Sequence, residues 1–153
     1  MTKTILIEPD WSREGVWRVL LDDPPHANAL SPTLVAQLDK ALHAAFDGDA
    51  RIVVIDSSSD RFCAGSDLSD IGLATDIDLR ARFGAIEDLL ETVRRAPALT
   101  IAVVRGAAFG AGADLVASCD YRIGTCNARF AFPGSRFGVV LGTRHLATLV
   151  GRP

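Results

Sequence analysis

Residues 99–118 read LTIAVVRGAAFGAGADLVAS, and this stretch decides the fold class. Its first six residues, Leu99–Val104, form a short and largely apolar run, which is typical of a strand buried on both faces of a parallel sheet. A glycine-rich turn follows at residues 106–112, and residues 113–118 are predicted to form a short helix. A strand, a turn and a helix in succession indicate an α/β protein.

The same alternation extends toward the N-terminus. Residues 51–57 hold a second short apolar run and lead into a loop at residues 62–67. Residues 31–47 and 78–95 carry apolar side chains at helical spacing, and the first of these helices begins at a serine followed by proline, a favourable cap. These segments therefore predict alternating strands and helices.

Shorter elements complete the expected order. Strands are predicted at residues 4–7 and 16–21, separated by a hairpin turn at Glu14 and Gly15. Further strands are predicted at residues 119–123 and 129–132, and a last helix at residues 142–150. We expect residues 1–153 to form a single domain.

Composition and charge narrow the class of protein. The chain has 153 residues, of which 48% are hydrophobic and 23% charged, and its formal net charge is −3. This balance excludes disorder, collagen and coiled coil as whole-chain descriptions, and it disfavours a nucleic-acid partner. No apolar run approaches the roughly 18 residues of a membrane span, so no membrane partner is expected. The three cysteines form no metal or disulfide pattern, which suits a cytoplasmic location.

Two glycine-bearing turns each follow a buried strand, and a ligand of an open α/β sheet binds beyond the carboxyl ends of its strands. The pattern Gly110-Ala111-Gly112 resembles part of a dinucleotide-binding loop, but Leu115 stands where a third glycine or alanine is needed. The chain holds no phosphate-binding GK[ST] loop and no G-x-S-x-G nucleophile elbow. Nucleotide binding and serine hydrolase chemistry are therefore disfavoured.

An oxyanion hole is another interpretation of these turns. It needs two preorganised N–H donors, and glycines let the backbone approach a substrate closely. The turn around Ser66 can offer one amide, and Ala111, at the start of the short helix, can offer the other. The alternative is that both segments are simply tight turns, and spacing alone favours this alternative.

Two segments resemble the signatures of a known family. Residues 62–68 (FCAGSDL) and 106–115 (GAAFGAGADL), the latter followed by Cys119 and Asp120, resemble those of the crotonase, or enoyl-CoA hydratase/isomerase, superfamily. Residues 28–31, 128–138 and 142–146 are similar to its other conserved blocks, in the same order. The resemblance runs along nearly the whole chain.

The resemblance implies a fold, a substrate and a site. The fold would be the family's ββα spiral, truncated before its C-terminal helical region, and the substrate an acyl-CoA thioester of fatty acid metabolism. The amides of Ser66 and Ala111 would form the oxyanion hole, with Asp114 as the third catalytic residue. No metal or redox cofactor is implied. The chain would form a homo-oligomer, the family's trimer or dimer of trimers, if the C-terminal part is supplied. The CoA groove would be lined by Pro25, His26, Ala27, Asn28, Cys63, Ala64, Gly65, Asp67, Leu68 and Gly110.

Two departures from the family pattern bear on chemistry. Asp114 stands at the position of the first hydratase glutamate, and Gly134 stands at the position of the second. Without a second carboxylate, we expect weak or absent hydration of an enoyl thioester. Isomerisation, decarboxylation and thioester hydrolysis need fewer acid–base groups and stay open. The alternative is a non-catalytic or fragmentary chain that acts as a binding or assembly subunit.

Several side chains have both a chemical and a structural interpretation. Asp114 is either a general base or a complement to the helix dipole. Asp67, Asp120 and Cys63 are expected to be structural. His26 and His145 have no identified acidic partner, and Arg136 contacts substrate, a neighbouring subunit or solvent. These alternatives depend on the tertiary structure.

Overall fold

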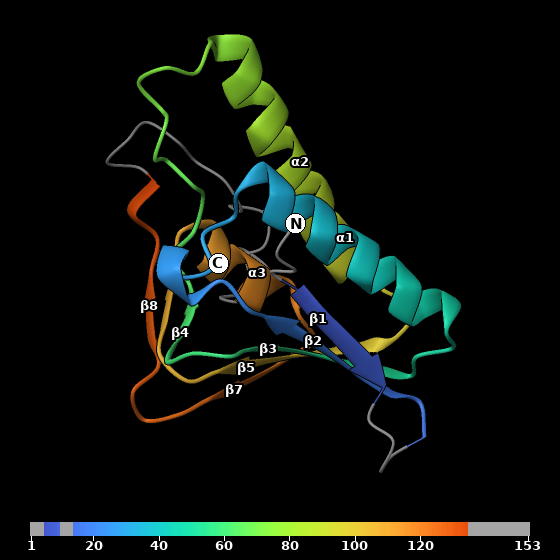
Figure 1. Cartoon of the computed structure of the whole chain (residues 1–153). Coiled ribbons are helices and arrows are strands. Elements are labelled where there is room, and N and C mark those ends of the chain that lie inside the picture. Colours follow the sequence, from blue (N-terminus) through green and yellow to red (C-terminus); the bar gives the residue numbers. More distant parts are fainter. Residues whose placement is uncertain (1–4, 10–13, 135–153) are drawn as a thin grey trace, which may run out of the picture.

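The computed structural model describes residues 5–9 and 14–134, and it confirms an α/β fold. Figure 1 shows three helices on one side of a twisted five-stranded sheet. The strand order is β1-β2-β3-β5-β7. The strands are β1 (Ile5–Pro9), β2 (Val16–Leu21), β3 (Ile52–Ser57), β5 (Leu99–Val104) and β7 (Tyr121–Gly124).

Strand direction in this sheet follows the sequence pattern. β1 and β2 form an antiparallel hairpin, in which Ile5 pairs with Leu21, and the turn residue Gly15 has φ +75°. β2, β3, β5 and β7 are parallel. The parallel direction confirms that the chain leaves β3 and β5 at the same edge of the sheet, where a ligand site was expected.

A second sheet of three short parallel strands lies beyond that edge. It consists of β4 (Arg61–Cys63), β6 (Ala107–Phe109) and β8 (Arg129–Ala131). The sequence predicted a loop at residues 62–67 and a turn at residues 106–112, so the strand content of both segments was missed. A three-residue strand is too short to show a period, and it forms here because its neighbours are brought alongside by the larger sheet.

The three helices are α1 (Pro32–Asp47), α2 (Asp76–Arg94) and α3 (Ala111–Ser118). Ser31 caps α1 as expected, since its Oγ accepts from the N–H of Leu34 at 3.2 Å. α2 begins two residues before its predicted start, because Thr75 and Asp78 form a reciprocal capping box. α3 also begins two residues early, and β7 begins two residues later than predicted. None of the helices in the described ranges is long and apolar enough to cross a membrane.

The core lies between the helices and the five-stranded sheet. The largest fully buried side chains include Phe62, Leu38, Ile55, Leu89 and Leu115. These residues come from both sheets and all three helices, so one contiguous core holds the two glycine-bearing segments in place.

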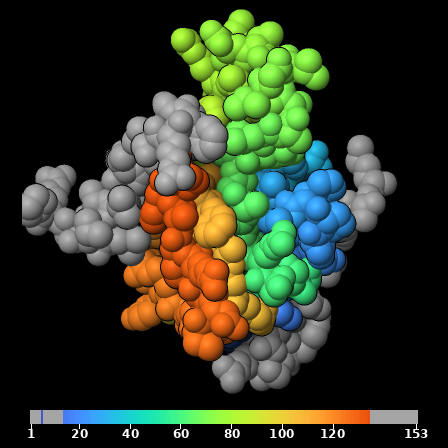
Figure 2. Space-filling view, turned by 90° about the vertical axis from the view of Figure 1, so that its left-hand side faces the viewer, coloured from blue at the N-terminus to red at the C-terminus, as the bar shows by residue number. Residues whose placement is uncertain are grey.

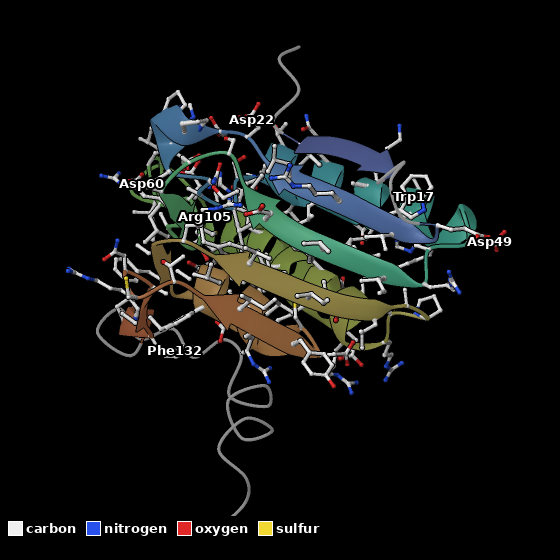
Figure 3. All side chains as sticks on the ribbon, turned by 90° about the horizontal axis from the view of Figure 1, so that it is seen from below. Trp17, Asp22, Asp49, Asp60, Arg105 and Phe132 are labelled. Atoms are coloured by element: carbon white, nitrogen blue, oxygen red, sulfur yellow. The ribbon has the colours of Figure 1, made fainter. Side chains whose placement is uncertain are left out.

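On β3, the buried carboxylate of Asp56 ties three strands together. Arg18 of β2 donates to Asp56 Oδ2 at 2.8 Å. Arg105, which follows β5, donates through Nη1 to Asp56 Oδ1 and through Nη2 to Asp56 Oδ2, the latter at 2.8 Å. Figure 3 shows Arg105 above the strands of the larger sheet. Bidentate pairing of this kind fixes the strand ends that lead into the second sheet.

Candidate active site

Three segments from distant parts of the sequence meet at the second sheet. The short 3-10 helix η1 (Pro24–His26) leads into residues 27–30, which run beside residues 64–67. The N–H of Ala64 donates to the carbonyl of Ala27 at 3.0 Å, and the N–H of Leu30 donates to the carbonyl of Gly65 at 2.7 Å. Figure 2 shows the face on which these segments lie beside β6 and β8.

The pairing of Leu30 with Ser66 sets the direction of the Ser66 amide. Leu30 accepts from the N–H of Asp67 at 3.3 Å and donates to Gly65, which makes Leu30 and Ser66 a parallel bridge. In such a bridge the two neighbours of Ser66 bond to Leu30, so the N–H and C=O of Ser66 itself point to the opposite side.

Gly65 brings this segment against the start of α3. It has φ +97°, and a Cβ placed on it would lie 2.7 Å from the carbonyl oxygen of Phe109 and 3.5 Å from the nitrogen of Ala111. Ala111 is the first residue of α3, so its N–H has no acceptor within the helix. Within residues 5–9 and 14–134, neither the Ser66 nor the Ala111 N–H donates a hydrogen bond to the backbone. Two amide groups without a backbone acceptor among the described residues therefore flank Gly65, since Ser66 follows it in sequence and Ala111 approaches it in space.

Asn28 fixes the loop that follows η1 through the hydrogen bonds of its side chain. Ala27 and Asn28 both have positive φ, at 52° and 53°. The Asn28 side chain is fully buried, and its Nδ2 donates to Ser57 Oγ and to the carbonyls of Arg61 and Phe62 at 2.9–3.1 Å. Its Oδ1 accepts from the N–H of Asp23 at 2.7 Å. Asn28 was predicted to line the CoA groove, but its side chain is occupied in fastening this loop.

Cys63 lies under the start of α3. Its thiol is fully buried, and burial raises the pKa of Cys63 to about 12. A Cβ on Gly112 would lie 2.8 Å from the Cys63 sulfur, so glycine is needed there for the helix to pack on β4. A neutral thiol in an apolar contact is a poor nucleophile, which confirms the packing role.

Asp114 lies in the first turn of α3, three residues after Ala111. It is only 3% exposed, its N–H donates to the carbonyl of Gly110 at 3.0 Å, and Oδ1 has no hydrogen-bond partner among the described residues. Burial, and secondly the charge of Glu87, raise the pKa of Asp114 to about 7. A carboxyl group that titrates near neutral pH can both accept and donate a proton.

Other predicted residues have structural partners. Asp67 accepts from the N–H of Ser69 at 3.0 Å, and Asp120 accepts from both the N–H and the hydroxyl of Thr100. Both therefore have the structural role that was expected of them.

His26 has an acidic partner, Asp23, so the prediction that it has none is wrong. Its Nδ1 lies 2.8 Å from Asp23 Oδ1, and this hydrogen bond raises the pKa of the exposed His26 ring. The η1 turn brings these side chains together three residues apart, and the sequence shows no periodic pattern that would reveal it. Arg136, His145 and the helix expected at residues 142–150 lie outside the described residues.

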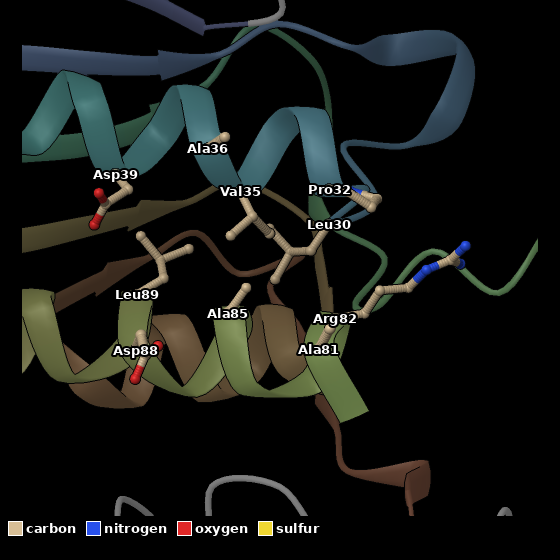
Figure 4. Close-up of a pocket in the computed structure, with 10 residues that line it drawn as sticks. All are labelled: Leu30, Pro32, Val35, Ala36, Asp39, Ala81, Arg82, Ala85, Asp88 and Leu89. Atoms are coloured by element: carbon tan, nitrogen blue, oxygen red, sulfur yellow. The ribbon is translucent and has the colours of Figure 1, made fainter. Parts of the chain in front are cut away.

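A groove that the sequence did not reveal lies between α1 and α2 (Figure 4), with a volume of about 410 Å³. Its apolar lining includes Leu30 and Leu89, and at one end Arg82 forms an ion pair with Asp70. The walls come from segments about 50 residues apart, so no local pattern could predict it. In the described ranges no three potential metal ligands lie together.

The chain matches one family model and is similar to known proteins. The model of the enoyl-CoA hydratase/isomerase family matches residues 12–152. The protein named "Probable enoyl-CoA hydratase echA6" of Mycobacterium bovis is 36% identical over 141 residues, which cover 90% of this chain and 56% of that protein.

Solved structures agree with the sequence comparison. The enoyl-CoA hydratase of Mycobacterium smegmatis superposes with a TM-score of 0.89 at 35% identity, over 99% of this chain and 60% of that one. The enoyl-CoA hydratase of Bacillus anthracis superposes with a TM-score of 0.89 at 26% identity, over 98% of this chain and 59% of that one. The expected crotonase-type fold is therefore confirmed, and the chain spans little more than half the length of these relatives.

Proposed function

The chain belongs to the enoyl-CoA hydratase/isomerase family, and on that premise we propose that it binds an acyl-CoA thioester and stabilises the oxyanion that forms at the thioester carbonyl. The observation that carries this proposal is that the N–H groups of Ser66 and Ala111, which flank Gly65, have no backbone acceptor among the described residues. The CoA moiety would lie along residues 25–28 and 63–68.

Two fixed amides suit this task because negative charge develops on the carbonyl oxygen only during the reaction. The donors are already oriented, so they need no reorganisation as the charge appears, and the start of α3 adds the positive end of a helix dipole. One such donor typically lowers a barrier by roughly 3–4 kcal/mol. This mechanism requires no metal and no redox cofactor.

Asp114 is the acid–base group of the proposed reaction. As a carboxylate it would remove the proton from Cα of a 3-enoyl thioester, and the double bond would move from Cβ–Cγ to Cα–Cβ. The same proton would be returned at Cγ, so no atom is gained or lost. Gly134 offers no side chain for holding water. Isomerisation is therefore favoured over hydration.

An assembly subunit is the second candidate function. Apolar side chains are exposed on the last two described strands, at Tyr121 (60%) and Ile123 (57%) of β7 and at Phe130 (50%) of β8. Exposed apolar strands of this kind commonly bind another chain. A monodisperse monomer in sedimentation velocity would contradict this candidate.

Thermal unfolding with and without crotonyl-CoA tests the main proposal. A ligand at 100 times its Kd stabilises the folded state by about 2.7 kcal/mol, so the transition should move upward. Free coenzyme A is the control that separates recognition of the thioester from binding of the nucleotide portion. An unfolding temperature that is the same with and without crotonyl-CoA would refute acyl-CoA binding. If the transition moves, a 3-enoyl-CoA is expected to yield the 2-enoyl isomer.

A further inference from the structure

The two strands that lead toward the amide donors separate at the edge of the five-stranded sheet. β3 and β5 pair side by side, and their ladder ends at the pair of Ile55 and Ala102. Beyond this pair β3 continues to pair with β2, as far as Ser57, and β5 continues to pair with β7, as far as Val104. The sheet therefore divides between β3 and β5, and the chain leaves each half toward the second sheet.

Each half of the divided edge leads to one of the proposed donors. β3 continues into β4 and then to Ser66, and β5 continues into β6 and then to Ala111. The pairing of β4 with β6 constrains their relative position only weakly, because each strand has three residues and the register shifts between Arg61 and Cys63. The separation of the two donors therefore depends also on what joins the two connections where they begin.

The side chain of Arg105, the first residue after β5, joins the two halves. It bonds both oxygens of the buried Asp56 carboxylate, through Nη1 and through Nη2, the latter at 2.8 Å. Nη1 also donates to the carbonyl of Ser57 at 2.9 Å. The next residue, Gly106, lies so close to Asp60 that a Cβ on the glycine would be 1.6 Å from the Asp60 carbonyl oxygen. Arg105 therefore holds the start of one connection against the start of the other.

Arg18 is a second cation on the same carboxylate, but it joins different strands. Its Nη2 donates to Asp56 Oδ2 at 2.8 Å, and its side chain is 43% exposed, against 45% for Arg105. Arg18 lies within β2, whose ladder with β3 covers the full length of both strands. Backbone hydrogen bonds already fix the position of β2 against β3, so Arg18 supplies charge to Asp56 without being needed for the register.

We propose that Arg105 is a positioning residue, which sets the separation of the Ser66 and Ala111 amides by holding the two connections together. Its planar guanidinium bonds two carboxylate oxygens and a carbonyl at once, which fixes direction as well as distance. Lysine would keep the charge but offers a single nitrogen, so it would neutralise Asp56 without holding this geometry. The effect on the reaction rate rests on the proposed function, whereas the effect on the amide positions does not.

The variant Arg105→Lys tests the positioning, and Arg18→Lys is its matched control on the same carboxylate. Both chains are expected to fold, because Asp56 keeps one arginine in either. In the full chain labelled with nitrogen-15, the amide resonances of Ser66 and Ala111 should shift in Arg105→Lys and keep their wild-type positions in Arg18→Lys. Unshifted resonances in Arg105→Lys, or equal shifts in both variants, would overturn the proposal. If Arg105→Lys does not fold, Arg105→Gln decides, and wild-type amide resonances in that variant contradict the positioning.

A rate measurement tests the consequence for the proposed reaction. With a 3-enoyl-CoA as substrate, kcat of Arg105→Lys should fall about tenfold or more, since a misplacement of about 1 Å can cost about a hundredfold in rate. KM should stay within about twofold, because the CoA moiety would bind to other residues. Arg18→Lys should keep the wild-type kcat. A wild-type kcat in Arg105→Lys, or equal losses in both variants, would overturn the positioning role. Shifted amide resonances in a chain that neither binds nor converts acyl-CoA would refute the proposed function alone.

Discussion

Replacing Asp114 by asparagine should change how the stability of the protein depends on pH. The pKa of this carboxyl group rises from 3.8 to about 7 on folding, mainly through burial. The folded state therefore keeps a proton that the unfolded chain releases, and stability is lost as the pH rises through this interval. Asparagine carries no charge at any of these pH values, so the variant does not suffer this loss.

The size of this stability change follows from the difference between the pKa values of Asp114 in the unfolded and folded states. A difference of about three pH units at about 1.4 kcal/mol per unit corresponds to about 4 kcal/mol between the two ends of the interval. Asp114 is 3% exposed, so little solvent screening reduces this value. The free energy of unfolding of the wild type, relative to Asp114→Asn, should therefore fall by up to about 4 kcal/mol from about pH 4 to about pH 8.

Urea unfolding at both pH values measures this difference, and taking wild type minus variant removes the contribution of all other titrating groups. Asp88→Asn is the control, since it makes the same substitution at an exposed position of α2 and leaves the Asp114 carboxyl group in place. A wild-type minus Asp114→Asn difference that is the same at both pH values would refute the reasoning, because Asp114 would then titrate alike in the folded and unfolded states.

Three further changes probe the site. Gly65→Ala should lower stability by about 2 kcal/mol or more and abolish the crotonyl-CoA thermal shift, since its φ is +97° and the new Cβ would meet the Phe109 carbonyl at 2.7 Å; an unchanged shift would argue against close contact of the two segments. Asn28→Ala should cost about 3 kcal/mol in urea unfolding, because four buried or half-buried hydrogen bonds are lost at once; a loss below about 1 kcal/mol would show that the loop is held otherwise. Gly134→Glu should raise hydration of crotonyl-CoA about tenfold, followed as loss of enoyl absorbance; a rate that stays at the wild-type level would mean that the missing carboxylate is not what limits hydration.

Much of the candidate site could be predicted from the sequence because its proposed hydrogen-bond donors are backbone amides. In the proposed function Ser66 and Ala111 would act through their amides, and the glycines at positions 65, 110 and 112 mark where the chain must turn or approach another segment closely. A resemblance over two short segments was therefore enough to locate both donors. The predicted CoA contacts and the catalytic role of Asp114 stay predictions that ligand binding must test.

The interactions that the sequence missed join positions with no shared local pattern. The pairing of Leu30 with Ser66 depends on how separate segments are packed, and the contact of His26 with Asp23 depends on the η1 turn. The three-residue strands β4 and β6 were likewise missed, and they form because the larger sheet aligns them, whereas the strand predicted at residues 129–132 is confirmed as β8. Periodicity could not predict β4 and β6, since each is shorter than two periods of a strand.

The sequence by itself determined the α/β class, the parallel direction of the buried strands and the family to which the chain belongs. These properties follow from local apolar runs, caps and glycine turns, which act over a few neighbouring residues. Only the tertiary structure decided the direction of the Ser66 amide, the burial of Asp114 and the ion pair of Arg105 with Asp56. Hydrogen-bond direction, desolvation and electrostatic coupling depend on distances between segments far apart in the chain, and those distances are set by packing.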